Sequence, residues 1–193
     1  MDKKNEIIEK ALDQFLKKGS KVLTMDDIAN EFGLSKKTLY SMFENKETLL
    51  NEAVDLLWNN FFNEINAIID GNENPLKKII AIYTIGIQKI SNVNPIFLIS
   101  LKKYHRDVMS EYDRYKSFMF ESVVKPLLQE AVKQKLIRQD INIELFHFIN
   151  FEDIDEKLWK YKVFEKHTSQ EALDYFIILK LKGILTKENF DLI

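Results

Sequence analysis

Glycine and proline occur only five and three times among 193 residues, so most of the chain must fold into long elements with few breaks. Both residues mark turns, and a turn-rich β architecture needs more of them. Hydrophobic residues make up 46% of the sequence, which is enough for a substantial core. Together these features predict an all-α protein.

Apolar residues recur at helical spacing, and capping residues mark where helices start. The first predicted helix has an apolar stripe from Ile7 to Leu16 and stops at Gly19. Thr24-x-x-Asp27 and Thr168-x-x-Glu171 have the spacing of capping boxes. We expect short helices after Thr24 and Ser35, and longer ones over 46–70, 75–91, 95–104, 107–135 (kinked at Pro126), 142–162 and 169–183.

Composition and charge exclude several classes of protein. The chain has no cysteine, which excludes disulfides and thiolate metal sites and fits a reducing cytoplasm. The charged start is not that of a signal peptide, and no apolar run reaches the roughly 18–20 residues of a membrane span. A net charge of −2 gives no general attraction to nucleic acid, so any DNA contact must come from a local cationic edge.

The segment from Thr24 to Leu50 has the pattern of a helix-turn-helix. Small Ala29 lets a second helix approach closely, and Gly33 can adopt the left-handed conformation that the turn needs. The predicted core and turn of the motif are Ile28, Ala29, Phe32, Gly33, Leu34, Leu39 and Phe43. The side chains expected to face base edges and phosphates are Lys36, Lys37, Thr38 and Ser41. A plain helical hairpin with a solvated lysine pair is the alternative.

An ordered string of residues in this region is similar to a known family. It consists of Phe15 and Gly19, Thr24-x-x-x-Ile28-Ala29, Gly33-Leu34-Ser35-x-x-Thr38-Leu39-Tyr40, Phe43, Lys46 and Leu49-Leu50. In these residues the chain resembles the TetR family of bacterial repressors. The resemblance is specific over about the first fifty residues, and beyond them it rests on length and helical layout.

The resemblance implies roles for individual residues. Thr24 would offer its hydroxyl and nearby N–H groups to a phosphate, Tyr40 would reach a phosphate with its hydroxyl, and Lys46 would clamp the backbone from the start of the fourth helix. Two departures stand out. Met42 replaces the usual aromatic residue or histidine, and the recognition helix has no arginine for a bidentate guanine contact.

The resemblance also implies a helix-turn-helix domain over 1–50 and a helical ligand-binding and dimerisation domain over 51–193, joined by the long fourth helix. Pairing follows from DNA geometry too, because two recognition helices must meet half-sites about 34–36 Å apart. In the family the last two long helices form the interface, here 142–162 and 169–183. The predicted interface residues are Ala172, Leu173, Phe176, Ile177, Leu179 and Lys180. Packing of this face within its own subunit is the alternative.

Middle helices rich in aromatic residues could enclose a hydrophobic small molecule. The candidate ligand-binding residues are Tyr83, Gln88, Phe97, Tyr104, His105, Phe118 and His147. Aromatic residues at helical spacing also form ordinary cores. Glu144-x-x-His147 is half of a di-iron signature, but the second half is missing, so we expect no metal. No Ser/His/Asp arrangement, glycine-rich phosphate loop or pair of catalytic carboxylates is recognisable, so we expect no cofactor and no catalytic centre.

The resulting hypothesis is a cytoplasmic, homodimeric transcriptional regulator that binds double-stranded operator DNA and, as a repressor, is released by a small hydrophobic inducer. One alternative is a DNA-binding protein without an inducer, controlled by a protein partner or serving a structural role on the chromosome. Another is a helical enzyme or lipid carrier whose helix-turn-helix pattern is coincidental.

Overall fold

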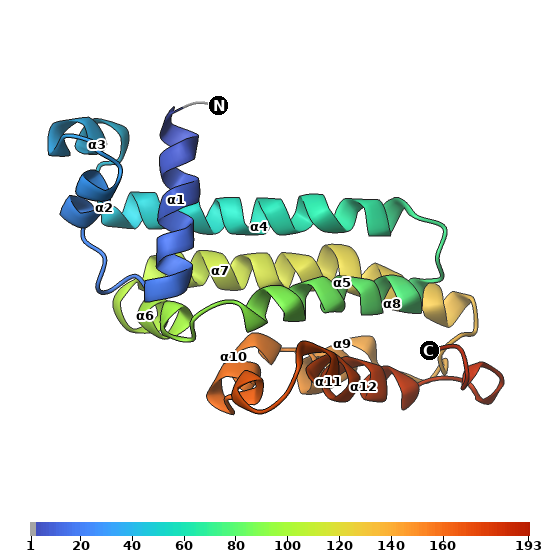
Figure 1. Ribbon diagram of the computed structural model, residues 1–193. Helices are drawn as coiled ribbons and strands as arrows, with labels where there is room; N and C mark the ends of the chain where they lie inside the picture. Colours follow the sequence, from blue (N-terminus) through green and yellow to red (C-terminus); the bar gives the residue numbers. More distant parts are fainter. Residues whose placement is uncertain (1–2) are drawn as a thin grey trace. The chain divides into compact units, whose positions relative to one another are not determined.

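The computed structural model describes residues 3–193, which form two compact units (Figure 1). Unit 1 consists of the chain up to Asn63 together with Val93–Lys116, and unit 2 of Glu64–Asn92 together with Ser117–Ile193. Within residues 3–193 the regular elements are helices, with one isolated β-bridge between Ile137 and Leu185, so the all-α prediction is confirmed. None of these helices is long and apolar enough to cross a membrane. The domain boundary at residue 50 stays a prediction, since the two units divide inside a helix.

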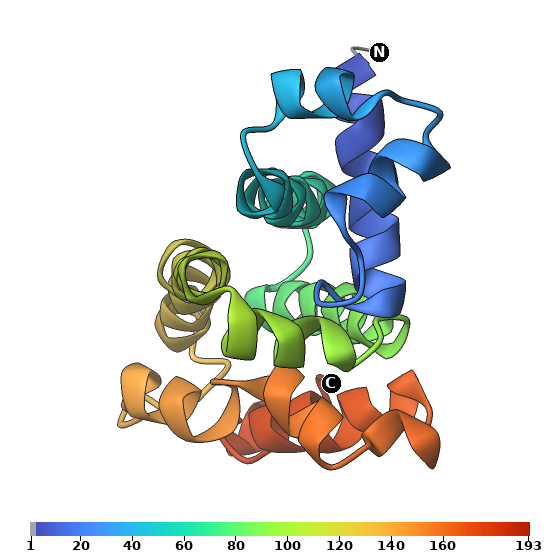
Figure 2. The ribbon, with the colours of Figure 1, turned by 90° about the vertical axis from the view of Figure 1, so that its left-hand side faces the viewer.

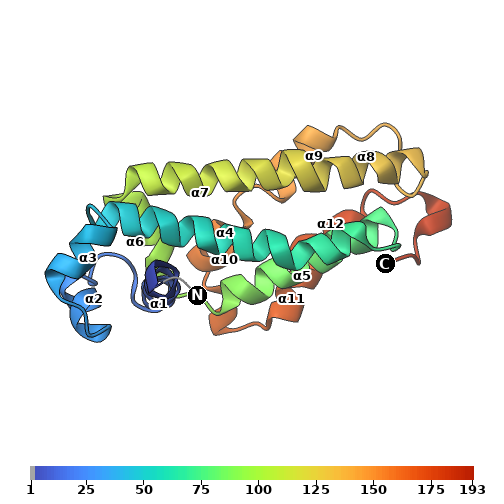
Figure 3. The same ribbon diagram turned by 90° about the horizontal axis from the view of Figure 1, so that it is seen from above.

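Unit 1 contains the N-terminal helices and two segments from the middle of the chain. In this unit α4 (Lys46–Asp70) and α7 (Arg106–Met119) lie side by side, and Trp58 of α4 stacks on Tyr115 of α7 with ring centroids 5.6 Å apart (Figure 3). Phe15, Phe43 and Leu49 are fully buried. The helices of unit 1 are α1 (Lys3–Lys18), α2 (Met25–Glu31), α3 (Lys36–Met42), most of α4 (Lys46–Asp70), α6 (Ile96–Tyr104) and most of α7 (Arg106–Met119).

Unit 2 is built around a continuous apolar core. Leu76 and Ile79 of α5 (Pro75–Ser91) pack there with Leu128 of α8 (Lys125–Lys133) and with Ile177 and Leu181 near the C-terminus. The helices of unit 2, apart from the ends of α4 and α7, are α5 (Pro75–Ser91), η1 (Phe120–Val124), α8 (Lys125–Lys133), α9 (Ile143–Asn150), α10 (Ile154–Lys160), η2 (Val163–Glu165), α11 (Ser169–Leu173), η3 (Asp174–Ile178), α12 (Leu179–Lys182) and η4 (Lys187–Asn189).

The predicted helix 107–135 contains a π-helical turn, η1, before Pro126. Proline has no N–H to donate, and its ring would meet the carbonyl of Ser122 in a regular helix. The backbone N–H of Lys125 instead donates to the carbonyl of Phe120, five residues back. The predicted disturbance at Pro126 therefore takes the form of a wider turn.

The prediction of one helix over 142–162 is wrong. Asn142 caps α9 as expected, but α9 ends at Asn150 and α10 begins at Ile154. Asp153, between them, has a left-handed backbone with φ 55°. Aspartate tolerates this conformation better than most residues, so its place in the sequence is compatible with the break.

Candidate nucleic-acid interface

The start of α2 is fixed by a reciprocal capping box. The Thr24 hydroxyl oxygen accepts from the Asp27 N–H at 3.1 Å, and Asp27 Oδ2 accepts from the Thr24 N–H at 2.9 Å. The Thr24 hydroxyl itself donates to Asp27 Oδ2 at 2.6 Å. These hydrogen bonds lower the pKa of Asp27. Thr24 is exposed as its predicted role requires, but a phosphate would have to replace Asp27 as the acceptor of its hydroxyl.

The turn between α2 and α3 depends on the backbone freedom of Gly33. The N–H of Leu34 donates to the Ala29 carbonyl at 2.8 Å, and the N–H of Gly33 to the Asn30 carbonyl at 3.2 Å. This Schellman arrangement needs a left-handed residue, and Gly33 has φ +62°. A Cβ at Gly33 would meet no atom within 4 Å, so the requirement for glycine is conformational and not steric.

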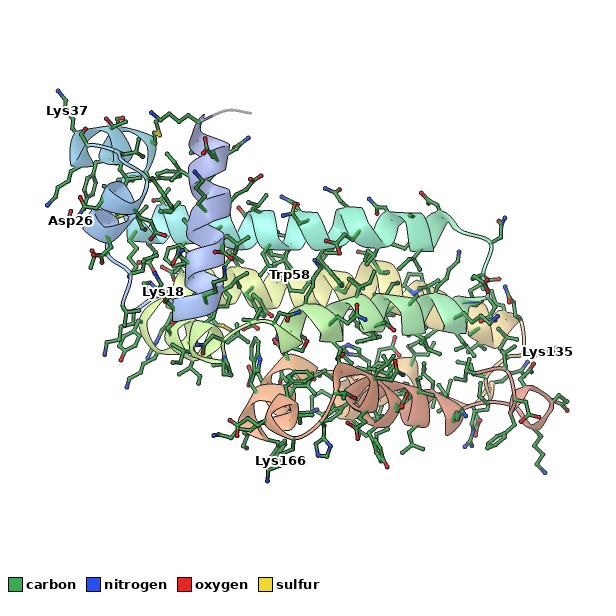
Figure 4. The ribbon with its side chains drawn as sticks, viewed as in Figure 1. Lys18, Asp26, Lys37, Trp58, Lys135 and Lys166 are labelled. Carbon is green, nitrogen blue, oxygen red and sulfur yellow. The ribbon has the colours of Figure 1, made fainter. Side chains whose placement is uncertain are left out.

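Helix α3 presents a buried face and an outward polar front. Ser35 caps it by accepting from the Thr38 N–H at 3.1 Å. Leu39 is fully buried, whereas Tyr40 is 49% exposed. Lys37, labelled in Figure 4, projects from α3 into solvent, and Ser41 is also exposed. Of the other predicted motif residues, Ile28, Ala29 and Phe43 are buried, and Phe32, Leu34 and Thr38 are half-buried.

Two of the predicted DNA-contacting lysines are held by other groups of the protein. Lys36 Nζ lies 2.5 Å from Asp26 Oδ2, and this hydrogen bond raises the pKa of Lys36. Lys46 is half-buried and donates to the carbonyl of Ser20, and burial lowers the pKa of Lys46. The partner of Lys46 lies 26 residues away, so no local pattern predicts this contact. Its role as a DNA clamp stays a prediction.

The end of α1 is joined to the start of α6 within unit 1. The backbone N–H of Asn94 donates to the Leu16 carbonyl at 2.9 Å, and its side-chain amide to the Lys17 carbonyl at 3.0 Å. The hydroxyls of Ser20 and Ser100 are buried and hydrogen-bonded at 2.8 Å. These contacts fix the end of α1 and the α1–α2 connection onto α6. Sequence analysis missed them because they pair residues about 80 positions apart.

The predicted ligand residues fall into both units. In unit 1, Phe97 is buried, Tyr104 is 43% exposed, and His105 Nδ1 lies 3.5 Å from Glu47 Oε1. Burial is the main cause of the lowered pKa of His105. Sequence analysis missed an aromatic cluster of unit 1, whose members are Trp58, Phe61, Phe62, Tyr112 and Tyr115.

In unit 2, His147 stacks on Phe120 with ring centroids 3.6 Å apart, and burial lowers the pKa of His147 to about 4. Tyr83 lies 5.1 Å from the Phe151 ring, and burial raises the pKa of Tyr83. Gln88 and Phe118 are exposed. Glu144, the partner of His147 in the half-signature for iron, pairs with Lys125 at 3.0 Å.

The residues of the predicted dimer face are also divided. Ala172, Leu173 and Ile177 are buried in the core of unit 2, so for these three the alternative of packing within the subunit holds. Phe176 is half-buried, and Leu179 and Lys180 are exposed. The exposed large apolar residues of α9 and of η3–α12, most of them missed in the sequence, are Leu145, Phe148, Ile149, Tyr175 and Leu179.

A short helix with a buried apolar face and an exposed polar front, set by a glycine turn against a capped helix, defines a helix-turn-helix DNA-binding protein. The family model for "Bacterial regulatory proteins, tetR family" matches residues 7–53. An uncharacterized HTH-type transcriptional regulator, YvaF of Bacillus subtilis, is 31% identical over 87% of this chain and 88% of its own length. The chain belongs to the TetR family of transcriptional regulators, which confirms the resemblance seen in its sequence.

The names of two other similar proteins include a regulatory role or a bound ligand. The transcriptional repressor KstR2 of Mycobacterium tuberculosis is 22% identical over 96% of this chain and 94% of its own length. The crystal structure of the regulator FadR from Bacillus subtilis in complex with stearoyl-CoA is 17% identical, with a TM-score of 0.78 over 94% of this chain and all of that one (100%). At 17% identity, this structural similarity shows that the two proteins share a fold.

Proposed function

We propose that the chain is a homodimeric repressor that binds operator DNA through α3 and leaves it when a hydrophobic small molecule binds the helical body. The main support for this proposal is the exposed polar face of α3. On this face Lys37, Tyr40 and Ser41 are exposed, while Leu39 on the opposite face is fully buried. The similarity to KstR2, which is named a repressor, supports repression over activation.

Operator binding replaces two interactions of the free protein by contacts with DNA phosphates. Lys36 leaves Asp26, and the Thr24 hydroxyl leaves Asp27, so that both can reach phosphates. Both pairs are exposed, and interactions of exposed charged groups contribute little to stability in water, so the exchange costs little. Asp26 remains close to the DNA and repels it.

Dimerisation is proposed through unit 2. Large apolar side chains stay exposed on α9 and on η3–α12, among them Phe148 at 65% and Tyr175 at 69%. Several large exposed apolar side chains in one unit favour a protein–protein contact there. Sedimentation of the intact chain should therefore give twice the monomer mass, and Phe148→Glu should shift it toward the monomer.

The aromatic cluster of unit 1 supports a hydrophobic ligand. The Trp58 indole lies on the α7 side of α4 (Figure 4), and its buried Nε1–H has no hydrogen-bond acceptor within residues 3–193. A bound molecule could supply that acceptor, since buried donors are rarely left unpaired. The complex of FadR with stearoyl-CoA makes long-chain acyl-CoA thioesters the first ligand class to test.

The DNA-binding part is tested by selecting duplexes from a random pool and measuring affinity by fluorescence anisotropy. We expect an operator with two related half-sites. Lys37→Ala should weaken binding about tenfold, Asp26→Asn should strengthen it, and Lys166→Ala in unit 2 should leave it unchanged. If no duplex is retained at low salt, the protein is not a DNA-binding regulator.

The ligand part uses the selected operator and stearoyl-CoA as the probe. We expect release of DNA and a higher melting temperature, with Trp58→Phe reducing both effects while operator affinity without ligand stays constant. Release by neither stearoyl-CoA nor other hydrophobic molecules of a metabolite library would favour a regulator without a small-molecule inducer.

A further inference from the structure

A second cationic surface lies in unit 1, outside the helix-turn-helix. Tyr104, at the end of α6, is 43% exposed and has two ammonium groups beside its ring. Lys21 Nζ lies 4.9 Å and Lys103 Nζ 5.5 Å from the ring centroid. Lys21 comes from the connection between α1 and α2, so the fold joins residues 82 positions apart in sequence (103 − 21). We call Lys21, Lys103 and Tyr104 the Tyr104 cluster.

The two segments that carry the Tyr104 cluster contribute positive charge and no carboxylate, and the acidic groups that approach them come from elsewhere, with Glu47 3.5 Å from His105 and Asp27 near Lys18. Residues 14–25 and 93–106 contain no aspartate or glutamate. Lys18 and Arg106 carry further positive charge next to the cluster in sequence, and both are exposed. In the part of the chain that the structure describes, none of Lys18, Lys21, Lys103 and Arg106 forms an ion pair, whereas Lys36 pairs with Asp26.

The α1–α2 connection and α6, which carry the Tyr104 cluster, lie on the same side of unit 1 as the recognition helix α3 (Figure 2). Figure 2 looks onto that side, and α2, α3, the α1–α2 connection and α6 are all turned toward the viewer. Lys21 also precedes Thr24, the predicted phosphate contact, by three residues, which span at most about 11 Å of extended chain. Lys18 marks the end of α1 beside this connection (Figure 4).

We propose that the Tyr104 cluster is a second DNA-contacting surface, which binds the phosphate backbone next to the stretch that α3 reads. This inference rests on the proposed function, because the helix-turn-helix brings the duplex to this side of unit 1. The lysines supply affinity without sequence preference. Tyr104 is a positioning residue: its ring holds two long side chains whose rotamer freedom would otherwise oppose binding.

The test compares Lys21→Gln/Lys103→Gln with the control Lys166→Gln/Lys187→Gln, which removes the same charge from exposed lysines of unit 2. Affinity is measured from 50 to 200 mM salt on the selected operator and on an unrelated duplex. Each phosphate contact adds about 0.9 to the log–log salt slope. The cluster variant should therefore have a slope lower by about 1.8 per bound subunit, and over this fourfold salt range it should lose about twelvefold less affinity per subunit than wild type.

The loss should be equal on both duplexes, because phosphates carry no sequence information. Tyr104→Phe keeps the ring and should match wild type, whereas Tyr104→Leu should weaken binding at an almost unchanged slope. Equal melting temperatures of all variants would show that they fold. If wild type binds its operator but the cluster variant keeps the wild-type slope, the second surface is wrong while the proposed function stands. If wild type binds no duplex, the proposed function fails first.

Discussion

Unit 1 and unit 2 both combine capping hydrogen bonds with a buried apolar core, but they differ in the regularity of their helices. In unit 1 the helix ends around α3 are held by specific hydrogen bonds, such as those of Thr24 with Asp27 and of Leu34 with Ala29. In unit 2 a broad apolar core runs from Leu76 to Ile184, and its helices contain π-helical turns and a break at Asp153. A recognition helix needs a fixed direction, whereas the body that we propose to bind a ligand and a second subunit tolerates irregular helices.

The comparison shows which interactions fix the direction of a helix. Short-range hydrogen bonds orient α3 to within a narrow range, because each one joins named atoms. Apolar burial is non-directional, so the core of unit 2 supplies stability without dictating one helix geometry. We therefore expect substitutions in unit 1 to alter DNA binding and stability together, and substitutions in the core of unit 2, away from the proposed dimer face, to alter stability alone in the absence of a ligand.

The largest expected effect is the loss of a core ring under α3. Phe43 is fully buried, so Phe43→Ala should lower the free energy of unfolding by about 3–5 kcal/mol and abolish operator binding. Phe148 of unit 2 is 65% exposed, and Phe148→Ala should change the monomer's stability by less than about 0.5 kcal/mol. Chemical denaturation measures both. Equal losses would show that burial does not separate the two positions.

The next effect concerns pH and belongs to unit 2. Burial lowers the pKa of His147 to about 4, so the unfolded chain binds a proton at a higher pH than the folded one. Stability is complete above the ordinary histidine pKa of about 6.5 and falls as the pH drops toward 4, by at most about 1.4 kcal/mol per unit and less because the ring is partly exposed. His147→Gln should flatten this slope in denaturation curves between pH 6.5 and 4. An unchanged slope would mean that other groups cause it.

Unit 1 could be predicted from sequence because its signals are local. Thr24 with Asp27, Ser35 with Thr38, and Gly33 each act within a few residues, and the helices form where those residues predict. Contacts between distant segments had no such signal. Ser20 with Ser100 and Lys46 with Ser20 depend on how α1, α4 and α6 meet, which no pattern in the chain encodes.

Unit 2 is harder to predict from sequence, because apolar periodicity shows neither where a helix is interrupted nor which surface covers its apolar face. The stripe over 142–162 continues through Asp153, although the backbone there turns left-handed. Periodicity likewise identified the apolar face of 169–183 but could not decide what covers it. Ala172 and Ile177 pack inside the subunit, and Tyr175, which was not predicted, is exposed instead.

A smaller effect tests the turn itself. Gly33→Ala should cost about 1–2 kcal/mol, because an L-residue with a left-handed backbone is strained, while the free space around it excludes a clash. Gly33→Asn should cost less, since asparagine tolerates this conformation. Operator affinity should follow the same order. If alanine and asparagine were equally harmful to binding, the side chain and not the backbone would be responsible.

The smallest effect separates the two units most cleanly, because each contains the same capping box. Thr168 and Glu171 of unit 2 repeat the hydrogen bonds of Thr24 and Asp27, with the threonine hydroxyl accepting at 3.1 Å in both. Thr24→Ala and Thr168→Ala should each lower the free energy of unfolding by about 1 kcal/mol.

Only Thr24→Ala should also weaken operator binding, because its hydroxyl is expected to reach a phosphate. Thr24→Ser keeps both the cap and that hydroxyl, so it should restore stability and affinity together. Denaturation and anisotropy on the same samples decide the outcome. Equal affinities for the two alanine variants would mean that Thr24 only caps α2, and the phosphate contact would have to come from other residues of unit 1.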